Sequence, residues 1–269
     1  MVIFMIHSFI SIHPIYQALL AGLITFLVTT LGSATVFFFK SVHKNIMDSM
    51  LSISAGIMLA ASYFSLLSPA IVMAKRLGFV VWFVILIGFI FGALSLFIGD
   101  KVLSLVAKRK KKEINSFKRC IMLFCSITLH NIPEGLVLGV AFGSIPFAFD
   151  KNAIWSAITL TLGIAIQNFP EGSAISLPLR RDGLSRMKSF LFGTASGIVE
   201  PIASIIGAIL VLKIQKILPF VLSFTAGAMI FVTVMELIPE SQTNQKKGLM
   251  TLFLIAGFSL MMVLEIILG

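Results

Sequence analysis

The sequence predicts an all-α membrane protein with eight transmembrane helices. Hydrophobic residues make up 58% of the 269 residues and charged residues only 12%, whereas a soluble domain is about half apolar and a quarter charged. Eight apolar stretches each reach the ~20 residues that a helix needs to span a bilayer. Because backbone polar groups in lipid must be paired within their own segment, each stretch is expected to be a helix and not a barrel strand.

These stretches fill nearly the whole chain, so residues 1–269 are expected to form a single integral membrane domain. Residues 1–13 lack the basic region of a cleavable signal peptide and are interpreted as a lead-in to the first helix. Cys120 and Cys125, five apart on one predicted helix, fit neither a disulfide framework nor a CxxC metal motif. The predicted spans are 14–39, 49–73, 78–106, 120–146, 152–178, 188–212, 215–239 and 248–268.

Basic residues are distributed unevenly between the loops. Of the 21 Lys and Arg residues, 16 fall in the loops that join odd-numbered to even-numbered helices. The positive-inside rule places those loops in the cytoplasm and both termini outside. The run Lys108–Lys112 is interpreted as a topology anchor that contacts anionic lipid headgroups. The net charge of +10 is therefore assigned to topology, and nucleic acid is not expected as a partner.

Glycines recur at every fourth position in three of the predicted helices, and such rows let membrane helices approach closely. Helix packing is the first interpretation, and a sliding surface between two helix bundles is an alternative. The rows are Gly88/Gly92, Gly135/Gly139/Gly143 and Gly193/Gly197.

Two nearly identical polar segments lie inside the fourth and fifth spans. His130-Asn-Ile-Pro-Glu-Gly135 and Gln167-Asn-Phe-Pro-Glu-Gly172 share four of six residues. Ionisable groups inside a span cost at least ~2.5–3.5 kcal/mol on insertion scales, so they need a functional reason. Because consecutive helices are antiparallel, the two segments are expected to face each other near the bilayer midplane. Glu200, in the sixth span, is a third carboxylate well inside an apolar run.

The spacing in each segment indicates a cation site. His130 and Glu134, like Gln167 and Glu171, are four residues apart and share one helix face. Each proline removes a backbone N–H and disturbs the carbonyl four residues before it, which predicts a kink. A mixture of imidazole nitrogen with carboxylate and amide oxygen suits zinc best, with iron, manganese, cobalt and cadmium as alternatives. Asn131 and Asn168 flank the same faces, and Met58 is a candidate thioether ligand from the second helix.

At these two segments the chain resembles the ZIP family of zinc/iron-regulated metal transporters, in particular its GufA-like branch. The resemblance implies zinc uptake into the cytoplasm through a binuclear intramembrane site, in a homodimer. It also implies an elevator-like movement of helices 1, 4, 5 and 6 against a scaffold of helices 2, 3, 7 and 8. It further implies no enzymatic activity and no cofactor besides the transported metal. The short loop after helix 3 lacks the His-rich run of eukaryotic members, which favours a bacterial inner membrane.

The resemblance also assigns the ligands. For the first ion position it implies His130, Glu134, Gln167, Glu171 and Met58. For the second it implies Asn131, the bridging Glu134 and Glu171, and Glu200, with Asn168 where members can carry aspartate. On helix 7 the family often has His-Glu near the exit, where this chain has Met235-Glu236.

Two other functions are weighed against uptake. Metal efflux would use the same ligands in the opposite direction. An intramembrane metalloenzyme would need a pair of histidines such as H-E-x-x-H, and neither polar segment supplies one.

Overall fold

The structure, a computed structural model, describes residues 12–39, 43–109, 116–147, 153–181, 183–213 and 215–268. All regular structure within these ranges is helical. The expectations for residues 1–11 and for Lys110–Lys112 lie outside the described residues, as do the side chains of Cys120 and His130.

Seven helices or runs of helices in the described ranges are long and apolar enough to cross a membrane. They match seven of the predicted spans, so the chain is an integral multi-pass membrane protein. They are Pro14–Phe38, Lys44–Arg76, Val81–Val102, Ala153–Arg181, Arg186–Lys213, Leu218–Ser241 and Lys247–Ile267.

The predicted fourth span corresponds to α7 (Ser116–Ser144), a helix of 29 residues that is not among these seven. The other elements follow the predicted order. They are α2 (Pro14–Ser33), α3 (Thr35–Phe38), α4 (Lys44–Ala61), η1 (Ser62–Leu67), α5 (Ser68–Arg76), α6 (Val81–Arg109), η2 (Ile145–Phe147), α8 (Ala153–Arg181), α9 (Arg186–Gly197), α10 (Val199–Lys213), η3 (Gln215–Ile217), α11 (Leu218–Val232), η4 (Thr233–Leu237), α12 (Ile238–Ser241) and α13 (Lys247–Leu268).

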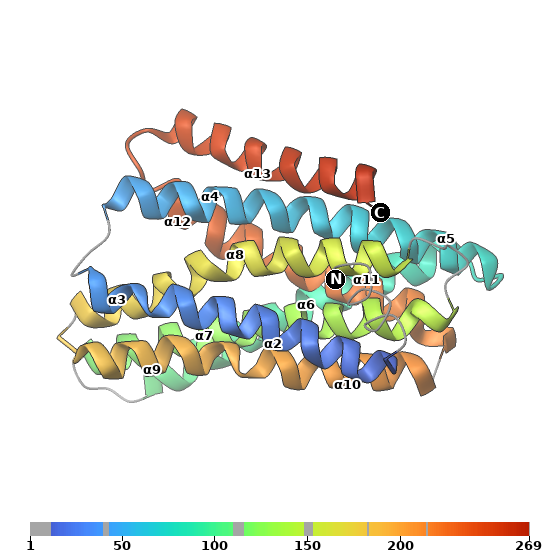
Figure 1. The fold of residues 1–269 in the computed structure, drawn as a ribbon, viewed down its shortest axis with the longest axis horizontal. Coiled ribbons are helices and arrows are strands. Elements are labelled where there is room, and N and C mark those ends of the chain that lie inside the picture. The colour runs from blue at the N-terminus through green and yellow to red at the C-terminus, as the bar shows by residue number, and fades with distance from the viewer. Residues whose placement is uncertain are drawn as a thin grey trace, which may run out of the picture.

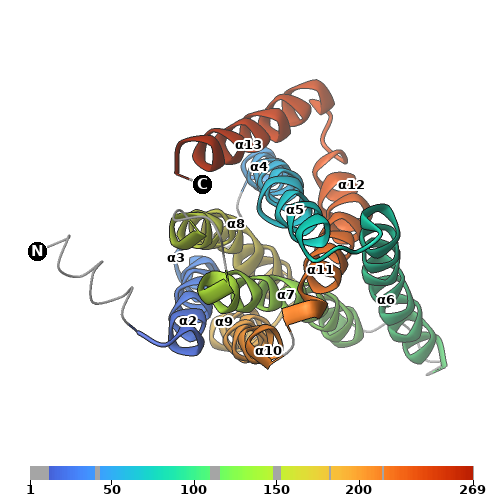
Figure 2. The ribbon, with the colours of Figure 1, turned by 90° about the vertical axis from the view of Figure 1, so that its right-hand side faces the viewer.

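The long helices form an elongated bundle in which α2 begins and α13 ends at the same end (Figure 1). Viewed along the bundle, they separate into two groups (Figure 2). The α2 group consists of α2, α7, α8, α9 and α10, and its most extensive contacts are those of α7 with α10 and of α2 with α8. The α4 group consists of α4, α6, α11 and α13, in which α6 packs on α11 and α4 on α13. Contacts of α4 with α8 and of α7 with α11 join the two groups.

The three glycine rows lie inside these groups. A side chain at Gly92 would overlap the backbone of α11, one at Gly139 would overlap the backbone of α10, and one at Gly193 would overlap Ser33 on α2. Close helix approach therefore depends on these glycines. The packing interpretation holds, and the alternative of a sliding surface is wrong for these rows, because each faces a helix of its own group.

Several spans depart from regular α-helix next to a proline. Two π-helical segments, η1 and η4, immediately precede the turns that contain Pro69 and Pro239. A proline has no backbone N–H to donate, and a π-segment lets the helix continue past the missing hydrogen bond. Span six is interrupted at Ile198, between α9 and α10 and three residues before Pro201. In contrast, α7 continues through Pro133 and α8 through Pro170 as single helices, so the kinks expected there stay a prediction.

A buried polar contact attaches the start of α4 to the turn between α12 and α13. Asn244 Nδ2 donates to Asp48 Oδ2 at 2.7 Å and to Asn45 Oδ1 at 2.9 Å. Asn244 Oδ1 accepts from the backbone N–H of Lys246 at 2.8 Å. Asp48 and Asn244 are each 3% exposed, so the amide provides the hydrogen bonding that a buried carboxylate requires.

Candidate metal site

The two polar segments lie next to each other in the interior of the α2 group. Glu134 on α7 and Gln167 on α8 are completely buried. Gln167 Nε2 donates a hydrogen bond to Glu134 Oε1 at 2.5 Å. The carboxylates of Glu171 and Glu200 are near enough to act electrostatically on that of Glu134. Three carboxylates from three spans therefore share one interior region, where like charges repel unless a cation or proton is present.

Glu200 lies in the first turn of α10, directly after the interruption at Ile198, and is completely buried. Its Oε2 accepts a hydrogen bond from Asn168 Nδ2 at 2.7 Å, and its Oε1 accepts one from Thr29 Oγ1 at 3.2 Å. The Asn168 amide also donates to the backbone oxygen of Thr25 at 3.4 Å. Helices α2, α8 and α10 thus meet at this carboxylate.

Several buried oxygen atoms around the carboxylates accept no hydrogen bond. Asn131 Nδ2 donates to the backbone oxygen of Ser196 at 3.0 Å, but its Oδ1 has no partner among the described residues. The same holds for Glu134 Oε2, Gln167 Oε1 and Asn168 Oδ1. A buried polar atom without a partner costs about 1–3 kcal/mol. All four are oxygen acceptors, the kind of atom that a cation binds. Asn131, Glu134, Gln167, Asn168, Glu171 and Glu200 are called the central cluster below.

The carboxylates alone would not complete the coordination of a metal ion at this site. Among the described side chains, no three His, Cys, Asp or Glu groups are positioned to hold one metal ion. The amide oxygens of the central cluster would have to complete the coordination, as oxygen ligands do for hard and borderline cations. His130 is on α7 one turn before Glu134, and its role as nitrogen ligand stays a prediction because its side chain is not described.

Met58 in α4 and the pair Met235-Glu236 in η4 lie outside the central cluster. Met58 is 1% exposed, and its sulfur accepts a hydrogen bond from Thr233 Oγ1 at 3.6 Å, so its role as an ion ligand stays a prediction. Met235 is 54% exposed on the outside of the bundle. Glu236 is partly buried and acts electrostatically on Glu171. The segment η4 thus contributes a carboxylate near the central cluster.

Sequence reasoning missed the contribution of the first helix. Thr29 contacts Glu200 through its hydroxyl, and Thr25 contacts Asn168 through its carbonyl. A signal was present, because Gln17, Thr25, Thr29 and Ser33 are spaced by multiples of four and form one buried polar stripe on an otherwise apolar helix. The interruption of span six beside Glu200 was also missed, although Gly197 and Pro201 bracket it.

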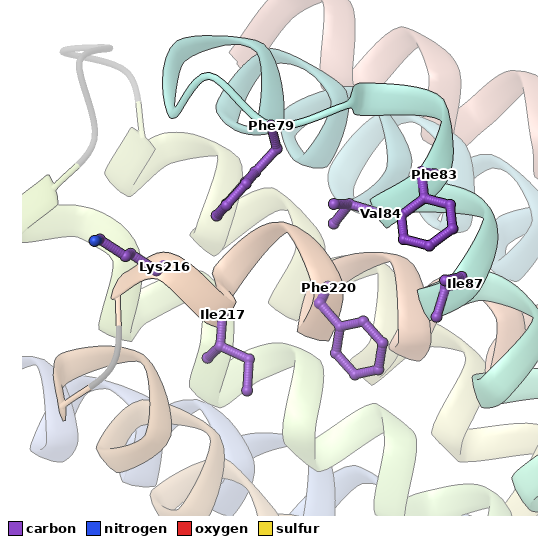
Figure 3. Close-up of a pocket in the computed structure, with 7 residues that line it drawn as sticks. All are labelled: Phe79, Phe83, Val84, Ile87, Lys216, Ile217 and Phe220. Carbon is purple, nitrogen blue, oxygen red and sulfur yellow. The ribbon is translucent and has the colours of Figure 1, made fainter.

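The groove on the surface of α6 and α11 is a poor candidate for an ion site (Figure 3). Its lining is almost entirely apolar, and the one charged side chain is a cation, so it offers no ligands for a metal. The lining residues are Phe79, Phe83, Val84, Ile87, Lys216, Ile217 and Phe220. None of them belongs to the central cluster.

Comparison with known proteins agrees with the sequence-based resemblance. A family model described as "ZIP Zinc transporter" matches residues 110–265, which include both polar segments and Glu200. The chain is 36% identical to the zinc transporter ZIP11 of Xenopus tropicalis, over 95% of this chain and 98% of the relative. It is 34% identical to the zinc transporter ZIPB of Bordetella bronchiseptica, over 94% of this chain and 81% of the relative.

A similarity to the zinc transporter GufA of Myxococcus xanthus covers 55% of this chain and 56% of that protein, at 32% identity. These relatives are named as transporters and not as enzymes, which confirms the expectation that the chain is not an enzyme. A family match over more than half of the chain, together with relatives that span nearly all of it, shows that the chain belongs to the ZIP family of zinc transporters.

Proposed function

We propose that this protein carries a divalent metal cation, zinc in the first place, across a membrane into the cytoplasm through the central cluster. The observation that carries the proposal is the set of four buried acceptor oxygens without hydrogen-bond partners, on Asn131, Glu134, Gln167 and Asn168. Unpaired acceptors beside three carboxylates form a strongly cation-attracting interior. In a membrane span such a group marks an ion pathway.

Zinc is proposed as the preferred ion because of the ligand types. Carboxylate and amide oxygens with one imidazole, from His130, suit zinc, and the same set also accepts iron(II), manganese or cadmium. The relatives that cover most of the chain are named zinc transporters. None of the six residues of the central cluster is a cysteine, and thiolate ligands would bind zinc more tightly than carboxylate and amide oxygens do.

Two ion positions are proposed. The first uses Glu134, Gln167 and Glu171, with His130 and Met58 as further ligands. The second shares Glu134 and Glu171 and adds ligands from the other side of the cluster. Those additional ligands are Asn131, Asn168 and Glu200.

An elevator-like mechanism is proposed for the transport step. All six members of the central cluster belong to the α2 group, which would move as a unit that carries the ion. The α4 group would form the scaffold and the contact between two copies in a homodimer. The proposed topology has eight spans with both termini outside, in agreement with the 16 basic residues of the odd-to-even loops. The proposed location is a bacterial inner membrane, supported by the absence of a His-rich run from residues 107–119.

Radioactive zinc uptake into vesicles that contain the purified protein tests the proposal. Glu134→Ala and Glu171→Ala are expected to reduce uptake to background, because each removes a carboxylate that both ion positions use. Glu240→Ala serves as the matched control, since Glu240 is exposed at the end of span seven and should leave uptake unchanged. If both cluster variants transport zinc like the parent, the site is wrong. If cells that express the parent lose zinc and do not accumulate it, the direction is wrong.

A further inference from the structure

The groove between α6 and α11, called the Lys216 groove below, extends from the ends of these two spans toward their middle. Lys216, in η3, lies at one end of the groove, and Ile87 lies at the other (Figure 3). Phe83 and Ile87 on α6 are four residues apart, so they line the groove from one helix face. The groove has a volume of about 240 Å³. Because it follows the spans, it is roughly parallel to the acyl chains of the surrounding lipid.

The end of the groove that carries Lys216 lies at the level of the lipid headgroups. Spans α6 and α11 both begin there, at Val81 and Leu218. Trp82, the second residue of α6, is 68% exposed, and exposed tryptophans at span ends are typical of the membrane–water interface. Lys216 is exposed as well. A lysine in this position can lay its apolar stem along the groove and hold its ammonium group among the headgroups.

The surroundings of this end are positively charged. Span ends α5, α6 and α11 adjoin here, and residues 73–84 and 213–224 contain no Asp or Glu. Their basic residues are Lys75, Arg76, Lys213 and Lys216. The predicted topology places both loops outside, where the positive-inside rule disfavours such residues. An anion complements this surface, and the membrane supplies one as the phosphate of a lipid headgroup.

On this basis we propose that the Lys216 groove binds an anionic phospholipid, with one acyl chain against Phe83 and Ile87 and the headgroup phosphate at Lys216. Buried methylenes of the chain contribute to binding whatever the headgroup is. A zwitterionic lipid brings a cation of its own next to Lys216, so the lysine favours a lipid with net negative charge by about fivefold. None of these residues belongs to the central cluster, and the inference does not depend on the proposed function.

A second groove on α6 provides an internal comparison. It lies between α5 and α6 and has a volume of about 590 Å³. Its lining includes Leu67, Trp82 and Phe89, and no charged side chain lines it. This Trp82 groove is at the same end of α6 and offers an acyl chain the same kind of apolar surface. It should therefore accept lipids without regard to headgroup charge.

Quenching of tryptophan fluorescence by lipids brominated in the acyl chain tests the proposal on the full-length protein in vesicles. The chain has two tryptophans, so the triple variant Trp82→Phe, Trp155→Phe, Phe83→Trp reports on the Lys216 groove. The single variant Trp155→Phe reports on the Trp82 groove. In the Lys216 groove, brominated phosphatidylglycerol is expected to bind at least about fivefold more strongly than brominated phosphatidylcholine. Lys216→Ala is expected to lower this preference about fivefold, whereas Lys216→Arg should retain it.

The Trp82 groove is the matched control and should show no preference between the two lipids. If Phe83→Trp does not fold, Phe220→Trp takes its place, because Phe220 lines the same groove. Equal binding of the two lipids in the Lys216 groove would overturn the proposal. So would a preference that Lys216→Ala leaves unchanged, or one that is equally strong in the Trp82 groove. Absence of quenching by either lipid would show that protein, such as a second copy of this chain, covers the groove, which also overturns it.

Discussion

Gly172→Ala is expected to abolish transport through a single methyl group. Gly172 ends the second polar segment and faces α2. A Cβ there would lie 2.8 Å from the backbone nitrogen of Ser33 and 2.9 Å from its Oγ, and it would overlap the backbone oxygen of Thr29. Ordinary contact begins at 3.4 Å, so the Ser33 nitrogen would have to retreat by about 0.6 Å, and the overlapped Thr29 oxygen by more. Because the obstacle is largely backbone, α2 and α8 must move apart.

Moving α2 and α8 apart would also weaken a contact of the central cluster. The hydrogen bond from Asn168 Nδ2 to the Thr25 oxygen crosses the same interface at 3.4 Å, and a separation of at least about 0.6 Å places it beyond hydrogen-bonding distance. Overpacking of this kind costs about 1–3 kcal/mol. We therefore expect a lower melting temperature in detergent and zinc uptake close to background in vesicles.

Gly99→Ala is the matched control for this prediction. Gly99 lies within α6, and the nearest atom to a Cβ there is Leu129 Cδ1 at 3.7 Å, an ordinary contact. Replacing glycine by alanine within a helix stabilises by about 0.5–1 kcal/mol when there is room, so this variant should melt slightly higher and transport normally. Equal melting temperatures and equal uptake for the two variants would refute the reasoning.

Two further predictions concern other contacts. Asn244→Leu removes the amide that donates to the buried Asp48 carboxylate and should cost about 1–3 kcal/mol of stability. Thermal unfolding measures that loss, and uptake per folded molecule should stay normal; an unchanged melting temperature would contradict it. Met58→Leu conserves side-chain volume, so it should cost less than about 1.5 kcal/mol. Because a thioether prefers soft metals, cadmium and zinc uptake should fall relative to manganese uptake; an equal reduction for all three would indicate that Met58 only packs.

The sequence alone was sufficient to predict the positions of the spans. Seven predicted stretches coincide with helices that can cross a membrane, because the thickness of the bilayer sets the length of an apolar run independently of how the helices pack. Glu134 and Glu171 were also identifiable from the sequence, since an ionisable group within an apolar run is unusual wherever the helix lies. The family followed from the same two segments.

The contacts that turn these residues into a site depend on tertiary structure. Thr29 donates to Glu200 across 171 residues, and no local pattern shows which face of α2 meets α10. The interruption at Ile198 and the π-segments before Pro69 and Pro239 could be identified only from the backbone conformation in the structure. The glycine rows predicted close packing, but only the fold shows that each row faces its own helix group. Residue types along the chain determine which groups must avoid lipid, whereas the packing of helices distant in sequence determines which groups they meet.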